Sequence, residues 1–189
     1  YYPSSSLRHT KTDSTGTSRY VYDGQNELQQ LDGLGTLVAQ YVYSLGIDSL
    51  LARTAGGTQQ YYLRDLIGSV TAVADPSQTL LATYRYDVFG SVRRQTGAAN
   101  NPYLFTARTL DQDSGLYYYR ARFFAPSVGQ FASFDPEGEG TGYDYVQSRP
   151  TLHSDPLGLF GLRMTHTMSP WDVWKNSPYS DDVFKFLLS

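Results

Sequence analysis

The chain contains no cysteine among its 189 residues. Disulfide bonds, zinc–thiolate sites and cysteine nucleophiles are therefore excluded, and the redox state of the protein's compartment stays open. Long apolar runs are missing too, since none approaches the roughly 18 residues that a membrane-spanning helix needs. The opening residues, YYPSSSLRHTKTDS, lack the apolar core of a signal peptide, so the chain reads as the middle of a longer polypeptide.

Charge is also sparse. Only 17% of the residues are charged and the formal net charge is −3. No basic cluster of the kind that grips a phosphate backbone is present, so we do not expect a nucleic-acid partner. We also expect no metal ion and no cofactor. The length suits one or two domains with a sizeable core.

Aromatic residues are abundant instead. They make up 15% of the chain, with 17 tyrosines, and 17 glycines accompany them. Tyrosine spaced by glycine turns is typical of strands that bury a ring and leave its hydroxyl in water. This composition favours an all-β fold.

The tyrosines follow a repeat. Tyr22, Tyr43, Tyr62 and Tyr86 mark four strand–turn segments, at steps of 21, 19 and 24 residues. Further strands are expected between them, over 35–39, 69–74 and 79–82. One β-hairpin cannot cover its own face, so we expect successive hairpins to pair into a continuous sheet.

A denser block begins at Asn101. Its segment 115–124, GLYYYRARFF, places arginines beside aromatic rings, as cation–π and carboxylate pairing require. The block also holds Asp-Pro-Xaa-Gly twice, at 135–138 and 155–158. Either copy alone is an ordinary turn.

Composition changes again after Leu159. Residues 160–189 contain both tryptophans and both methionines of the chain. Short helices are expected to begin near Ser169 and Ser180, where proline or acidic residues occupy the first turn. The spacing therefore predicts a boundary at or just after Leu159.

The Tyr-Asp hairpins, the GLYYYRARFF segment and the closing DPLGL together resemble the Rhs/YD-repeat family, which includes the C subunits of Tc toxins and, more distantly, the teneurins. The resemblance covers about residues 19–159. It implies YD-repeat hairpins that spiral into a cocoon-like β-sheet shell over residues 1–100. It further implies a core block at 101–159 that plugs the shell, and a short, partly helical tail at 160–189 that begins the variable toxin.

The same resemblance implies a chemical activity. In the family the core block cuts its own chain after the Asp-Pro-Xaa-Gly-Leu motif, in the manner of a single-turnover aspartic protease. Asp135 and Asp155 fall on the two catalytic aspartates, and the scissile bond falls between Leu159 and Phe160. Arg122 matches an arginine that orients a carboxylate or stabilises the oxyanion. Two carboxylates brought close do not both ionise, so one is an acid while the other activates water.

The resemblance also implies partners and a place of action. The expected partners are the rest of an Rhs shell or other copies of the chain through sheet edges, the C-terminal toxin cargo, and secretion-system or Tc toxin components. The protein is expected in the bacterial cytoplasm before export and then as a secreted or delivered effector.

The sequence leaves alternatives to the cutting activity. One departure is the segment Phe123-Phe124-Ala125-Pro126, which lacks an acidic residue that the family usually has there. The first alternative is a non-enzymatic YD-repeat scaffold in which Asp135 and Asp155 are only turn residues. The second is an adhesive or carbohydrate-binding surface built from exposed rows of tyrosine.

Overall fold

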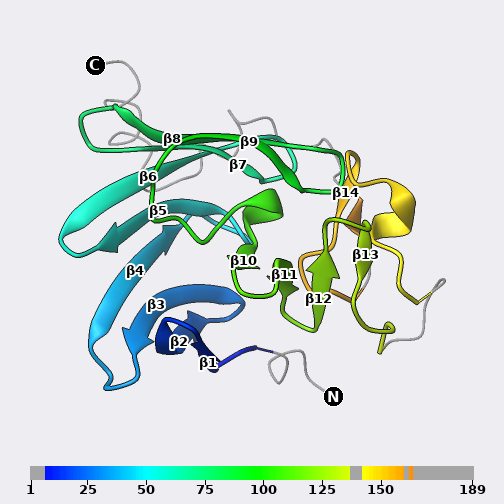
Figure 1. Cartoon of the computed structure of the whole chain (residues 1–189), viewed down its shortest axis with the longest axis horizontal. Helices are drawn as coiled ribbons and strands as arrows, with labels where there is room; N and C mark the ends of the chain where they lie inside the picture. Colours follow the sequence, from blue (N-terminus) through cyan, green and yellow to red (C-terminus); the bar gives the residue numbers. More distant parts are fainter. Residues whose placement is uncertain (1–6, 137–141, 160–161, 164–189) are drawn as a thin grey trace.

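The structure is a computed structural model that describes residues 7–136, 142–159 and 162–163 (Figure 1). The expected all-β fold is confirmed. The larger sheet has nine antiparallel strands in sequence order. They are β1 (Thr10–Asp13), β2 (Gly16–Asp23), β3 (Asn26–Asp32), β4 (Leu37–Tyr43), β5 (Leu50–Ala55), β6 (Thr58–Arg64), β7 (Val70–Ala74), β8 (Leu80–Tyr86) and β9 (Val92–Gly97).

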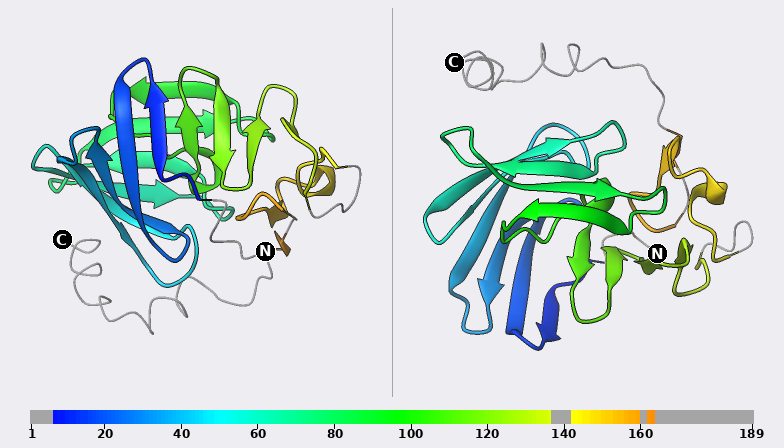
Figure 2. Two further views of the ribbon diagram at one scale, coloured as in Figure 1. Left: turned by 90° about the horizontal axis from the view of Figure 1, so that it is seen from below. Right: turned by 45° about the horizontal axis from the view of Figure 1, so that its top comes forward.

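A smaller sheet follows in the core block. Its four antiparallel strands are β10 (Thr109–Asp111), β11 (Leu116–Tyr119), β12 (Arg122–Ala125) and β13 (Gln130–Phe131). Two short strands, β14 (His153–Ser154) and β15 (Leu162–Arg163), pair with each other, and 3₁₀ turns η2 (Phe105–Ala107) and η3 (Val146–Ser148) connect these elements. The larger sheet curves, and the smaller sheet lies on its concave side (Figures 1 and 2).

Four turns of the larger sheet are closed by an aspartate. In Asp75 and Asp87 the side-chain Oδ1 accepts the backbone N–H groups two and four residues later, at 2.8–3.0 Å. Asp32 and Asp65 make the same pair of bonds. The repeated aspartate therefore closes each turn by satisfying backbone donors that the tight bend leaves unpaired.

The strand boundaries differ from the sequence prediction in one respect. Segments 35–39 and 79–82 are not separate strands, because they continue into the tyrosine-bearing strands β4 and β8. The partners of the tyrosine strands are β3, β5, β7 and β9. Strands β3 and β9 are largely polar, so their hydrophobic alternation is too weak to reveal them.

Tyrosine rings fill the space between the two sheets. Tyr41, Tyr62 and Tyr84 are buried in the interior, and Tyr103 meets the rings of Tyr41 and Tyr62 edge-on, at centroid distances of 5.1 and 6.4 Å. The prediction that the hydroxyls lie in water is wrong for the most buried of these tyrosines. The hydroxyls of Tyr119 and Tyr145 bond to each other at 3.1 Å inside the core, as a buried hydroxyl requires. The buried Tyr62 hydroxyl, in contrast, has no hydrogen-bond partner among the described residues.

The expected helices of the tail fall at 160–161 and 164–189, outside the described residues. In the part of the chain that the structure describes, no helix has the length and apolarity to span a membrane.

Candidate functional site

Arg122 lies at the start of β12, directly after the two-residue turn that links it to β11. Its side chain is buried, with the guanidinium carbon 3.6 Å from the centre of the Phe131 ring. A cation in such a position stacks on the ring face and loses most of its hydration. It therefore needs negative partners nearby.

Both predicted aspartates supply that charge. Arg122 Nη2 is 3.0 Å from Asp135 Oδ2 and 3.4 Å from Asp155 Oδ2. The two aspartates are 6% and 1% exposed, respectively. The structure thus brings together the three residues that the sequence singled out, from segments 13 and 33 positions away from Arg122.

The backbone of the second Asp-Pro turn completes the arrangement. Asp155 Oδ1 accepts the N–H groups of Gly158 and Leu159, at 2.8 and 3.2 Å. Arg122 Nε donates to the carbonyl of Gly158. The guanidinium therefore reaches the carbonyl one residue before Leu159. Phe160, the other side of the predicted scissile bond, lies outside the described residues.

The first Asp-Pro turn is described only in part, because residues 137–141 lie outside the described residues. The Asp135 N–H donates to the carbonyl of Gly142 at 2.8 Å. The same carbonyl accepts a hydrogen bond from Arg122 Nη1 at 3.3 Å. The backbone on both sides of this turn is thus fixed next to the guanidinium.

Burial and pairing oppose each other in the electrostatics. Burial raises the pKa of Asp155, while its backbone bonds and Arg122 act in the other direction. Burial lowers the pKa of Arg122, and the two aspartates counteract this. The site is therefore not a bare pair of carboxyls. One cation lies between two carboxyls, and a single added proton makes the set neutral.

Glycine is required at position 158. Its φ is +68°. A Cβ at this position would collide with the carbonyl oxygen of Tyr119 and lie 3.2 Å from the backbone nitrogen of Arg122. Gly24 has a similar φ of +56°, but nothing lies within 4 Å of its Cβ position. The close approach lets the turn at 155–158 dock against the β11–β12 hairpin.

This pair of glycines gives a direct test. Gly24→Ala is expected to cost about 1–2 kcal/mol, from the left-handed backbone alone. Gly158→Ala is expected to cost about 1–3 kcal/mol more, because the hairpin and the turn must move apart. Urea unfolding of both variants measures the difference. Equal losses would contradict the docking of the turn on the hairpin.

The sequence did not reveal a second buried ion cluster beside this site. Arg108 and Arg120 both pair with Asp48, a residue of the β4–β5 turn. Arg120 belongs to the same Arg-Xaa-Arg segment as Arg122, which was the available signal. The described residues contain no group of three or more His, Cys, Asp or Glu side chains placed to hold a metal ion.

No protein-family model matches the chain. Individual proteins, however, are similar to it in sequence. The tRNA3(Ser)-specific nuclease WapA of Bacillus spizizenii is 31% identical over 163 residues, covering 80% of this chain and 7% of the relative. The probable deoxyribonuclease RhsB of Dickeya dadantii is 36% identical over 95 residues, which cover 47% of this chain and 6% of the relative. This chain is an Rhs-related domain.

Solved structures show the same fold for this Rhs-related domain. The crystal structure of TcdB2–TccC3 aligns with a TM-score of 0.59 at 22% identity, covering 79% of this chain and 8% of that chain. A Photorhabdus luminescens Tc holotoxin pore with a substituted TccC3 aligns with a TM-score of 0.63 at 20% identity, covering 85% of this chain and 8% of that chain. The Rhs-related domain thus spans less than a tenth of each of these proteins.

Proposed function

We propose that this domain closes an Rhs-type shell and cuts its own chain once, between Leu159 and Phe160. Residues 1–100 are the shell hairpins, 101–159 the core block, and 160–189 the beginning of the released cargo. One observation carries the proposal. A single buried guanidinium contacts both aspartates and the carbonyl of Gly158, one residue before the proposed cut.

The proposed reaction is the hydrolysis of one peptide bond. Asp135, which has the shorter contact with Arg122, removes a proton from water as the water oxygen bonds to the carbonyl carbon of Leu159. Asp155, the more buried carboxyl, gives a proton to the amide nitrogen of Phe160 as the C–N bond breaks. The products are a carboxyl group on Leu159 and an amine on Phe160. Arg122 holds both carboxyls in place and opposes the negative charge that develops on the carbonyl oxygen.

The edges of the larger sheet support the shell role. Strands β1 and β9 are its two end strands. Strand β9 is exposed along its whole length and carries Arg93 and Arg94, and charge of this kind discourages strand pairing. Strand β1 also carries charge, but its Lys11 is paired with Asp13 and Asp111. We therefore assign β1 as the edge where the rest of the shell, or another copy, continues the sheet.

Cellular partners and location follow from the same proposal. The enclosed partner is the C-terminal toxin cargo. The outside partners are components of a secretion system or of a Tc toxin. The protein is made in the bacterial cytoplasm and acts after secretion or delivery, as the kinship with toxin proteins supports.

The test is the intact mass of freshly made protein under denaturing conditions. Wild type is expected to split between Leu159 and Phe160, while Asp135→Asn and Asp155→Asn stay whole. Asp75→Asn is the matched control, because Asp75 also begins an Asp-Pro turn but lies away from the site. It is expected to be cut like wild type. A wild-type chain that stays whole at 21.2 kDa rejects the activity.

A non-enzymatic scaffold is the second candidate, and one observation favours it. Asp155 caps its turn through Oδ1 much as the shell aspartates do, without chemistry. On that reading Asp155→Asn changes stability and leaves the mass of every variant unchanged. The tyrosine-surface alternative has less support, because the tyrosine rows lie in the interior.

A further inference from the structure

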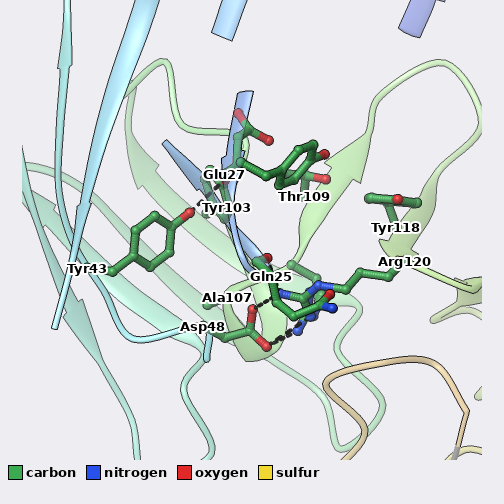
Figure 3. Close-up of a pocket in the computed structure, with 11 residues that line it drawn as sticks. Gln25, Glu27, Tyr43, Asp48, Tyr103, Ala107, Thr109, Tyr118 and Arg120 are labelled. Atoms are coloured by element: carbon green, nitrogen blue, oxygen red, sulfur yellow. Dashed lines mark hydrogen bonds and ion pairs between the residues drawn. The ribbon is translucent and has the colours of Figure 1, made fainter. Parts of the chain in front are cut away.

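The second ion cluster lies where the shell meets the Asp155–Leu159 turn. Arg120 occupies the β11–β12 turn with a φ of 61°, and Asp48 occupies the β4–β5 turn with a φ of 60°. Figure 3 shows the Asp48 carboxylate facing the guanidinium groups of the core block. Non-glycine residues in this backbone region are held by their surroundings, and they gather at functional sites.

Arg120 joins three separate segments. Its Nη2 is 2.6 Å from Asp48 Oδ1 and donates to the carbonyl of Gln25 at 2.7 Å. Its Nη1 donates to the carbonyl of Pro156. The neighbouring Ala121 N–H donates to the carbonyl of Leu157 at 3.2 Å. The two shell turns are thus tied to the middle of the Asp155–Leu159 turn through one side chain.

Asp48 is itself fixed by the shell. Its N–H donates to Asn26 Oδ1 at 3.1 Å, and its carbonyl accepts from Arg64 Nη1 at 2.8 Å. Its carboxylate pairs with both Arg108 and Arg120. Two buried cations share one anion, so the guanidinium of Arg120 depends on the carbonyls of Gln25 and Pro156 as additional acceptors.

The cluster is not a ligand site. The cavity beside it has a volume of about 30 Å³, enough for about two water molecules. Its walls include Tyr22, Tyr43, Tyr103 and Tyr118, and neither Asp135 nor Asp155 lines it. A mechanical role remains, because every strong contact of Arg120 runs between the shell and the turn.

We propose that Arg120 and Asp48 are positioning residues that clamp the Asp155–Leu159 turn, so that cutting requires the β2–β3 and β4–β5 turns of the shell to be folded against the core block. This inference rests on the proposed self-cutting and adds its regulation. Cutting therefore waits until the β4–β5 turn, which carries Asp48, has folded against the core block. Before this turn docks, Arg120 is not held beside the carbonyl of Pro156, and the Asp155–Leu159 turn does not hold Leu159 beside the aspartates.

Lysine at position 120 tests the clamp while keeping the charge. A lysine ammonium is a point charge and lacks the planar fork that serves Asp48, Gln25 and Pro156 together. The rate of cutting is followed by intact mass after timed quenching of cell-free synthesis of the full chain. Arg120→Lys and Asp48→Asn are expected to be cut at least about tenfold more slowly than wild type, because small misplacements of reacting groups cost rate steeply.

A second measurement separates positioning from general loss of stability. Hydrogen exchange of residues 155–159 is compared in the uncut Asp135→Asn background, with and without Arg120→Lys. The amides of Gly158 and Leu159, which bond to Asp155, are expected to exchange about tenfold faster with Arg120→Lys, while those of β6–β8 stay unchanged. Arg93→Lys, at an exposed ion pair with Asp87, is the control and changes neither readout.

The outcomes are distinguishable. Slower cutting together with faster exchange confined to the turn supports the clamp. A wild-type chain that is cut, with Arg120→Lys cut equally fast, overturns this inference alone. A wild-type chain that stays whole overturns the proposed self-cutting, and the role of the clamp in cutting falls with it. Faster exchange throughout β6–β8 means a general loss of stability and also overturns the clamp.

Discussion

Replacing Arg122 with methionine is expected to lower the free energy of unfolding at pH 8 by about 3–5 kcal/mol, the usual cost of leaving a buried charge without its partner. Asp135 and Asp155 are both nearly inaccessible to water, and Arg122 contacts both. Methionine keeps the packing against Phe131 but supplies no charge. Such a loss is a large fraction of the stability of an ordinary domain.

The effect is expected to depend on pH. Arg122 acts to lower the pKa of Asp155, against burial, which raises it. The pKa of Asp155 is already above its ordinary value with Arg122 present, and without Arg122 the folded form takes up a proton at a still higher pH. The stability of the variant therefore falls as pH rises, and its deficit relative to wild type is smaller at pH 4 than at pH 8.

Urea unfolding at both pH values makes the comparison. Arg93→Met is the matched control, because the Arg93 side chain is 71% exposed in its ion pair with Asp87, and such pairs contribute about 0–1 kcal/mol. The double variant Arg122→Met with Asp155→Asn is expected to recover part of the loss, since it removes one unpaired carboxyl. A loss at Arg122 no larger than at Arg93 would contradict the buried site.

The sequence predicted the fold because its signals are local. A tyrosine strand followed by a tight turn recurs about every 20 residues. In four turns of the larger sheet an aspartate bonds to the amides two and four positions on. The polar strand β9 gave no such signal, because all of its residues are exposed and its hydrophobic alternation is weak. Local pattern thus defined the turns better than the strands between them.

The site was predictable only in part. The aspartates and Arg122 came from a resemblance to known motifs, and their placement around one guanidinium is a property of the folded chain. Asp48 could not be found in this way. It lies 72 positions before Arg120, and a single aspartate in a turn looks like any other turn aspartate. Only the curvature of the larger sheet brings its β4–β5 turn to the core block.

Glu27 shows the same limit and leads to the second large expected effect. It belongs to the polar strand β3, yet only 8% of its surface is exposed. It faces the interior between the sheets, with Arg8, Arg53 and Tyr103 as its charged and hydrogen-bonding neighbours. Burial raises its pKa to about 7, from the ordinary value of 4.5 for a glutamate. The partial compensation from the arginines is too weak to cancel the loss of hydration.

This shift makes the protein less stable as pH rises. Between about pH 4.5 and 7 the folded chain keeps a proton on Glu27 that the unfolded chain releases, so folding is favoured below this window and loses that advantage across it. A shift of this size corresponds to about 3 kcal/mol. Glu27→Gln, which stays neutral, is therefore expected to match wild type near pH 4.5 and to exceed it by about 3 kcal/mol at pH 8.

Urea unfolding of both chains from pH 4.5 to pH 8 measures this difference, and subtracting the curves cancels groups that titrate equally in the two chains. Asp23→Asn is the control for the removal of one carboxylate, because Asp23 is exposed at the end of β2. A Glu27→Gln curve parallel to that of wild type would mean that Glu27 is ionised in the folded protein, with Arg8 and Arg53 fully balancing its charge. A divergent curve would place a neutral carboxyl within the tyrosine-lined interior, so that the fold is more stable at acidic pH than at neutral pH.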